Sequence, residues 1–177
     1  MKSTLKQLVL KPQDFLVALK IAVNNDRTFL LAILADELCM AVSAVHGCVV
    51  RCEQARLISR ASGEIRPINT SISEFALHGV RYAFPPVQGP LTRGVATTTA
   101  GPSLVEYFDQ AKAMPHVWPD ALGTAYGPAL LPLHTSVPEA SRLDQKLFDA
   151  LTLIDAVRAG AARERELAIP LLRERLA

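Results

Sequence analysis

Apolar residues recur at helical spacing in the first third of the chain. Pro12 suits the first turn of a helix, because the N–H that proline lacks would have no partner there. Four apolar residues follow at this spacing: Phe15, Leu16, Leu19 and Val23. Lys20 falls on another face, and the Asn-Asn-Asp run at 24–26 is expected to end the helix.

The same periodicity predicts two further helices, over 30–38 and 42–55. The second of them carries one apolar stripe, which we expect to be buried: Val42, Val45, Val49 and Cys52. Two short strands are predicted next, at 57–60 and 65–68, with a turn near Gly63.

A fourth helix is predicted over 71–82, with Asn69 or Thr70 as its cap. The segment 85–102 is rich in Pro, Gly and Thr and is expected to be irregular. We expect 117–118 and 125–133 to pair as a small hairpin. Helices are then predicted over 138–142, 144–159 and 161–175, the second with an apolar face of Leu147, Leu151, Ile154 and Val157. The three Asp residues 144, 149 and 155 are expected on its solvated side.

These elements predict a mainly α protein with small β elements, an α+β fold. The predicted organisation is an N-terminal unit at 1–70, a connecting helix at 71–84 and a C-terminal region at 85–177. With 177 residues, half of them hydrophobic, the chain can bury a core, which excludes a disordered protein. The three cysteines form no Cys-x-x-Cys pair, which argues against a disulfide framework or structural zinc.

The chain has no apolar run of the roughly 18 residues that a membrane span needs, and its first eight residues lack the apolar core of a secretory signal. We therefore expect a soluble, cytoplasmic protein without a membrane partner. The formal net charge is +2, and the positive excess lies in residues 1–66. This asymmetry is weak support for a polyanionic partner.

The order of helix, helix, turn, helix and two strands within 1–70 is that of a winged helix-turn-helix. Such units need a small residue where the two helices cross, a turn residue four positions later and a β-branched core residue ten positions after the first. Ala35 and Val45 meet these needs. Cys39 departs from them, because glycine usually supplies the left-handed turn there.

The segments Leu34-Ala35-Asp36-Glu37-Leu38 and Ser43-Ala44-Val45-His46 resemble those of the MarR-like winged helix-turn-helix regulators of bacteria. Later segments at 77–85, 89–94 and 163–167 are similar to uncharacterised bacterial winged-helix proteins, some of them antitoxin-like neighbours of nucleotidyltransferase genes. The resemblance implies sequence-specific binding of double-stranded DNA and transcriptional regulation. It departs from the family at Ala41, Ile33 and Gly47, where a cap, a solvated residue and a better helix former are usual.

If the helix at 42–55 lies in a major groove, its outer face and the wing supply the DNA contacts. The predicted contact residues are Ser43, Ala44, His46, Gly47, Arg51, Gln54, Arg60 and Arg66. Arg51 and Gln54 can pair bidentately with guanine and adenine, while Arg60 and Arg66 would reach the backbone or the minor groove. Because the helix itself carries one cation, we expect modest affinity per monomer and a homodimer on the operator.

The sequence supports no catalytic, cofactor or metal site. Ser103, Ser136 and Ser141 lack the Gly-x-Ser-x-Gly motif, and the Gly89–Gly94 segment lacks the Lys-Ser/Thr ending of a phosphate loop. His78, His116 and His134 have no Cys or carboxylate at ligand spacing. Cys48 and Cys52 are expected in the core rather than in a redox switch.

Two other functions remain open from the sequence. The alternating charges at 163–166 suggest a solvated helix, or one that docks on a partner through Leu167, Leu171, Leu172 and Leu176. The chain would then be antitoxin-like, or its winged helix would serve only as a protein-interaction module. Phosphate contacts make binding depend on salt, whereas an apolar protein interface gives little such dependence.

Overall fold

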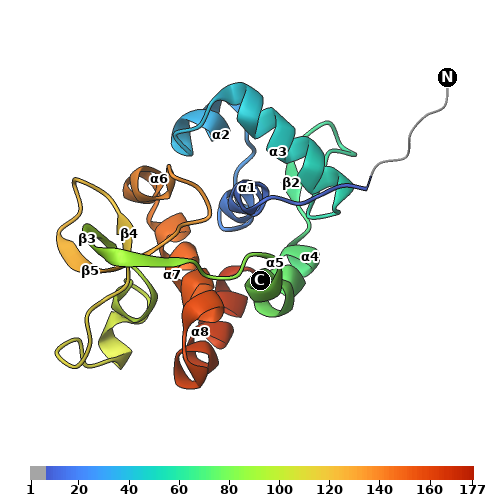
Figure 1. Ribbon diagram of the computed structural model, residues 1–177. Coiled ribbons are helices and arrows are strands. Elements are labelled where there is room, and N and C mark those ends of the chain that lie inside the picture. The colour runs from blue at the N-terminus through green and yellow to red at the C-terminus, as the bar shows by residue number, and fades with distance from the viewer. Residues whose placement is uncertain (1–6) are drawn as a thin grey trace.

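The structure is a computed structural model that describes residues 7–177, so what we inferred from residues 1–6 lies outside it. The first three helices are α1 (Pro12–Ala22), α2 (Leu31–Glu37) and α3 (Val42–Gln54), close to the predicted ranges. Pro12 occupies the first turn of α1, as predicted. Figure 1 shows α1 in the middle of the molecule and α2 and α3 along its upper edge. α1 is buried along nearly its whole length, because it contacts α3, α4 and α7.

The predicted stripe on α3 is confirmed at Val45, Val49 and Cys52, all fully buried, but not at Val42. Val42 is 48 % exposed. It is the first residue of the helix, and side chains on a helix lean toward its N-terminus. The side chain of Val42 therefore projects past the end of α3 into solvent instead of into the core.

Two short strands follow α3, as predicted. β1 (Ile58–Ser59) and β2 (Arg66–Pro67) pair antiparallel, and Gly63 in the loop between them has a left-handed φ of +80°. An isolated antiparallel bridge joins Phe29, between α1 and α2, to Ile65. The segment before α2 therefore extends this small sheet by a third short piece of backbone.

The connecting helix is confirmed, but it is not uniform. It consists of α4 (Asn69–Glu74), a π-helical turn at Phe75–Gly79 and α5 (Val80–Ala83). Neither predicted cap acts as one, since Ile68 precedes the first helical residue and no side chain caps the helix. Close packing explains the glycine in the π turn, because a Cβ at Gly79 would lie 2.8 Å from the ring of Phe75.

The region expected to be irregular contains the longest strand of the protein. β3 (Gln88–Ala96) pairs antiparallel with both β4 (Val117–Pro119) and β5 (Ala125–Leu130). Proline and glycine are tolerated there because the pairing register shifts between Gln88 and Leu91, a local bulge that contains Pro90. The predicted hairpin of β4 with β5 is wrong: β3 pairs with both, and β4 and β5 meet only in parallel, through Val117 and Ala129.

Two 3₁₀ turns, Thr98–Ala100 and Val105–Tyr107, lie between β3 and β4, and the chain closes with α6 (Val137–Leu143), α7 (Gln145–Ala159) and α8 (Ala162–Arg175). The apolar face predicted for α7 is buried. The expected solvation of the Asp residues is wrong for Asp144, whose side chain is 9 % exposed, and for Asp155, which is 2 % exposed. The Asp155 carboxylate accepts hydrogen bonds from Trp118 Nε1 (2.6 Å), Thr97 Oγ1 (3.0 Å) and Arg158 (2.7 Å). The bonds from Trp118 on β4 and from Thr97 at the end of β3 join the β3–β4–β5 sheet to α7.

The apolar core runs without interruption from Phe15 on α1 to Leu172 on α8, so the boundary predicted near residue 70 does not separate two cores. The mainly helical architecture with small sheets agrees with the predicted α+β class. Within residues 7–177 no single helix is long and apolar enough to cross a membrane. Only α2 and α3 taken together have the required length and apolarity, and they are separated by a 108° bend.

Candidate nucleic-acid interface

The turn between α2 and α3 sets the direction of α3. The two helices are bent by 108° relative to each other. Cys39 adopts the left-handed conformation, with φ of +53°, and the N–H of Met40 donates to the carbonyl of Ala35 (3.0 Å). Ala35 and Val45 are fully buried where the helices cross. The sequence spacing is thus confirmed at all three positions, and Cys39 takes the backbone conformation that glycine would have supplied.

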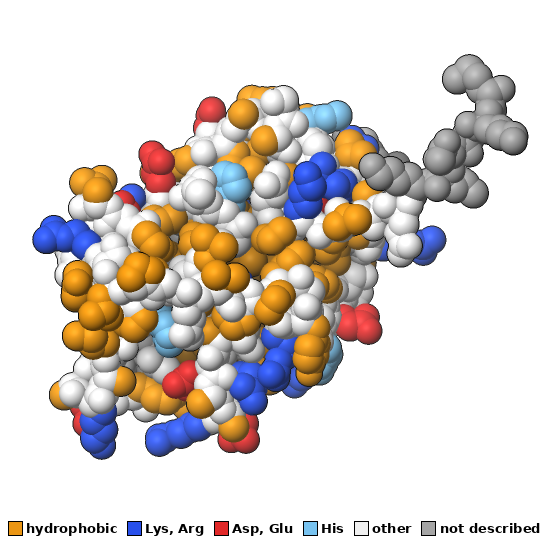
Figure 2. Space-filling view, in the orientation of Figure 1, with side chains coloured by type: hydrophobic (Ala, Val, Ile, Leu, Met, Phe, Trp, Pro, Cys, Tyr) orange, Lys and Arg blue, Asp and Glu red, His pale blue; other side chains and the backbone are white. Residues whose placement is uncertain are grey.

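The outer side of α3 carries five of the predicted contact residues. Ser43, His46 and Gln54 are exposed, and Ala44 and Gly47 are half-buried. Within the described chain the side chains of Ser43, His46 and Gln54 have no hydrogen-bond partner. In Figure 2 hydrophobic and uncharged side chains predominate over α2 and α3, at the top of the molecule. This side of α3 is therefore free for an external ligand.

Arg51 is not free on that face. Its Nε and one terminal nitrogen donate to the two carboxylate oxygens of Asp14 on α1, at 2.8 and 2.7 Å. Asp14 is fully buried, and Arg51 also contacts the sulfur of Cys48. Gly47 makes room for this arrangement, because a Cβ there would lie 3.2 Å from the guanidinium of Arg51. Because Gly47 has no side chain, the guanidinium of Arg51 can lie over the preceding turn of α3 and reach Asp14.

Arg51 can either keep its ion pair with Asp14 or contact a base, and the free energies of these two interactions can be compared. Breaking a buried ion pair by removing one partner costs roughly 3–5 kcal/mol, because the other charge stays buried and unpaired. A good bidentate contact to a base contributes about 1–3 kcal/mol of discrimination. Moving Arg51 from Asp14 to a guanine would therefore lose more than it gains. In this structure Arg51 holds α3 against α1, and the prediction that it reads a base would require it to leave Asp14.

The two arginines of the wing are also paired, but at the surface. Arg60 donates to Glu53 at the end of α3, and this hydrogen bond lowers the pKa of Glu53. Arg66 donates to Glu64 in the loop (2.7 Å). Both pairs lie at the surface, where solvent screens the attraction and an ion pair contributes little to stability. Unlike Arg51, these side chains can exchange their partner for a phosphate at little cost.

Most of the basic residues that the structure describes between 7 and 66 are therefore paired with acids of the same chain. Among the described residues of this part, Lys11 and Arg56 are exposed and have no acidic partner. Any attraction of this surface to a polyanion is weaker than the count of basic residues suggests.

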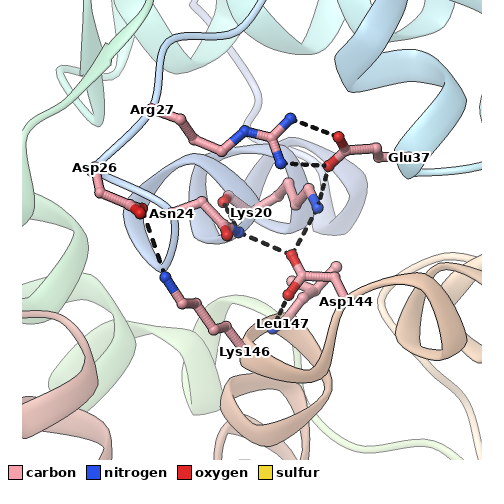
Figure 3. A network of polar contacts seen from close by, with 8 residues as sticks. All are labelled: Lys20, Asn24, Asp26, Arg27, Glu37, Asp144, Lys146 and Leu147. Atoms are coloured by element: carbon pink, nitrogen blue, oxygen red, sulfur yellow. Dashed lines mark hydrogen bonds and ion pairs between the residues drawn. The ribbon is translucent and has the colours of Figure 1, made fainter.

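A buried lysine joins α1 and α2 to the C-terminal region, although helical periodicity alone did not predict its burial (Figure 3). Lys20 was assigned to a separate face of its helix, yet it is 1 % exposed. Its Nζ lies 2.6 Å from both Glu37 on α2 and Asp144, the residue that caps α7. Asn24 also donates to Asp144 (2.8 Å). The signal in the sequence was the uninterrupted apolar neighbourhood of Lys20, in Ala-Leu-Lys-Ile-Ala at 18–22.

This network keeps both acids ionised. Burial alone would raise the pKa of Glu37, but hydrogen bonds from Arg27 and Lys20 outweigh it and lower the pKa. Burial likewise opposes ionisation of Asp144, and hydrogen bonds from Lys20, the Leu147 N–H and Asn24 lower its pKa. A crevice of about 540 Å³ lies beside these groups, lined in part by Arg27 and Lys146. Apart from Asp36, which is exposed, the charged side chains that line it are paired within the chain.

The cysteines pack as predicted. Cys48 and Cys52 are fully buried, and burial raises the pKa of Cys48 to about 11 and that of Cys52 further. Neither thiol is activated for redox chemistry. Among residues 7–177 no three His, Cys, Asp or Glu side chains gather as a metal site.

The leucines expected to bind a partner through α8 are used inside the chain. Leu172 and Leu176 are 0 % and 2 % exposed, and Leu167 and Leu171 are half-buried against the same core. α8 packs on α7. The apolar face of α8 is therefore not open to a partner, which corrects that expectation.

Comparison of the chain with models of protein families, with curated proteins and with solved structures gives no significant match.

Proposed function

We propose that this protein binds double-stranded DNA, with α3 entering the major groove and the β1–β2 hairpin acting as the wing of a winged helix-turn-helix. The observation that carries the proposal is the junction of α2 and α3: a 108° bend around a left-handed residue. Helix-turn-helix pairs meet at about 90–120° across such short turns. This geometry leaves the outer side of α3 exposed along its length.

The small sheet beside α3 supports the same proposal. The chain runs from α1 through the Phe29 bridge to α2 and α3, and then into β1 and β2. Phe29 pairs with Ile65, so the sheet is tied to the start of α2. A hairpin held in this way stands next to the exposed face of α3, where its arginines would reach the phosphates that flank a groove.

The charge distribution supports modest affinity. Base contacts would come from Ser43, His46 and Gln54, and phosphate contacts from Arg60 and Arg66 after they leave Glu53 and Glu64. With few free cations, each copy would release few counterions on binding. Regulation by one copy alone would then be weak, and we propose that two copies bind adjacent half-sites about one helical turn apart.

Fluorescence anisotropy of the purified protein with the DNA upstream of its own gene tests the proposal. Binding is expected to weaken as salt rises and to survive excess unrelated duplex. Arg60→Gln and Arg66→Gln should each reduce the slope of log K against log salt by about 1. Arg173→Gln, which changes an exposed arginine on α8 away from both the wing and the assigned dimer surface, is the matched control and should leave the slope unchanged. A slope near zero with every duplex would overturn the proposal.

The dimer has its own candidate surface. Exposed apolar side chains gather over β3 and β5, in the middle of the face in Figure 2: Val87, Leu91, Tyr126 and Leu131. Their neighbourhood follows from the pairing of Leu91 with Pro128 and from the hydrogen bond of the Leu131 N–H to Val87. We assign this surface to a second copy. Sedimentation should show a dimer that Leu91→Asp converts to a monomer, and a monomeric parent protein would overturn the assignment.

A protein-interaction module is the second candidate. It is favoured by the pairing of Arg51, Arg60 and Arg66 with acids of the same chain. In that case the exposed side of α3 would bind a protein, and binding would be nearly independent of salt. The anisotropy experiment separates the two, because only phosphate contacts give a salt slope.

A further inference from the structure

The exposed end of α3 has an unusual composition for a surface that reads DNA. Val42 is 48 % exposed, Ala44 two positions later is half-buried, and neither side chain has a polar group. Ser43 lies between them. In helix-turn-helix units the N-terminal residues of the second helix meet the base edges. Side chains without charge or amide therefore occupy the positions nearest to the bases.

The helix also has no free Arg or Lys to read guanine. Guanine presents two acceptors, N7 and O6, in the major groove and is most often read by Arg or Lys. Arg51 is the only Arg or Lys on α3, and both of its forked donors are held by buried Asp14 at 2.8 and 2.7 Å. Gln54, whose amide matches adenine, remains exposed farther along the helix.

Small apolar side chains have one specific target in the major groove, the C5-methyl group of thymine. We propose that α3 selects A·T base pairs, with Val42 in contact with a thymine methyl group. Contact with the methyl group favours thymine. Guanine gains no matching contact, because Arg51 is bound to Asp14 and does not face the groove. This inference rests on the proposed DNA binding and names the class of sequence that is bound.

The test uses duplexes selected from a random pool by the full-length protein. In the tightest duplex each thymine is replaced singly by uracil, which removes the methyl group and keeps the base pair. At the positions facing α3 the affinity is expected to fall about fourfold for each methyl lost, the effect of one buried methylene-sized group. Val42→Ala should abolish this sensitivity at one position of each half-site.

A matched control is Val105→Ala, which shortens a 38 % exposed valine outside both α3 and the assigned dimer surface and should leave the uracil sensitivity intact. Both variants alter surface side chains, so a loss of folding is not expected. An A·T preference without uracil sensitivity would indicate recognition of a narrow minor groove and would overturn the inference. Selection of G·C-rich duplexes would overturn it as well.

The two failures can be told apart. Salt-dependent binding to sites that are not A·T-rich would leave the proposed function standing and remove only this inference. The absence of salt-dependent binding to any duplex would remove both. Uracil sensitivity that disappears in Val42→Ala would support both.

Discussion

Arg51 on α3 and Asp14 on α1 face each other through two parallel hydrogen bonds, 2.8 and 2.7 Å long. The carboxylate is fully buried, and its Oδ2 also accepts from the backbone N–H of Lys11 (2.8 Å). The pair fixes the rotation of α3 about its own axis relative to α1. It therefore determines which side chains of α3 face outward.

Removing the arginine should be costly for the fold. Arg51→Met leaves the buried Asp14 carboxylate without its partner, and we expect the free energy of unfolding to fall by about 3 kcal/mol. The double variant Asp14→Leu with Arg51→Met should recover most of this loss, since no buried charge remains. Urea unfolding of the four proteins of this cycle measures the coupling. A single variant as stable as the parent would contradict the structural role of Arg51.

The Lys20 network predicts a pH dependence. The folded-state pKa values of Glu37 and Asp144 lie below their ordinary values of 4.5 and 3.8. Their contribution to stability is therefore present above those values and is lost as the pH falls through the folded-state values. The free energy of unfolding of the parent protein should therefore fall as the pH drops below about 5 and through the lowered folded-state values.

Lys20→Met should flatten this fall while lowering stability at pH 7, because Asp144 loses its buried partner. Lys146→Met is the matched control: Lys146 is exposed and lies 3.5 Å from Asp26 at the surface. It should follow the parent at every pH. Parallel curves for Lys20→Met and the parent would show that Lys20 does not hold the two acids.

The turn of the helix-turn-helix predicts a stabilising substitution. Cys39 has φ of +53°, a conformation that costs a residue with a Cβ about 1 kcal/mol relative to glycine. Cys39→Gly should therefore raise the free energy of unfolding by about 0.5–1 kcal/mol over Cys39→Ala, which removes the thiol but keeps the Cβ. Thermal unfolding of both variants measures this difference. Equal stabilities would mean that the turn relaxes without strain.

Buried hydrogen bonds to Asp155 hold the β3–β4–β5 sheet against α7. Trp118 is the single tryptophan, is 1 % exposed, and donates Nε1–H to the buried carboxylate of Asp155 (2.6 Å). Trp118→Phe removes this donor and should lower the free energy of unfolding by about 1–3 kcal/mol. Circular dichroism is the appropriate measurement, because the variant has no tryptophan fluorescence. Thr97→Val, which removes a second donor to the same carboxylate, should have an effect of the same sign; no effect in either variant would contradict the network.

Periodicity in the sequence was sufficient to predict the helices, because a buried helix face repeats every three to four residues whatever it packs against. The ranges of α1, α3, α7 and α8 follow from this pattern, as do the crossing at Ala35 and the core position of Val45. β3 escaped it, because a strand interrupted by Pro90 at a bulge has the composition of a loop. Its partners, β4 and β5, begin more than twenty positions after the end of β3, so the pairing is not visible locally.

Charged side chains were the part that the sequence alone did not determine. The pattern along α3 placed Arg51 on the solvent side, and only the position of Asp14 on another helix draws it inward. Lys20 is buried because Glu37 and Asp144 come together around it from α2 and from the start of α7. Apolar burial is a property of each helix and its spacing, so it is visible locally. The pairing of charges depends on which segments the fold brings within about 3 Å, and that is decided only by the tertiary structure.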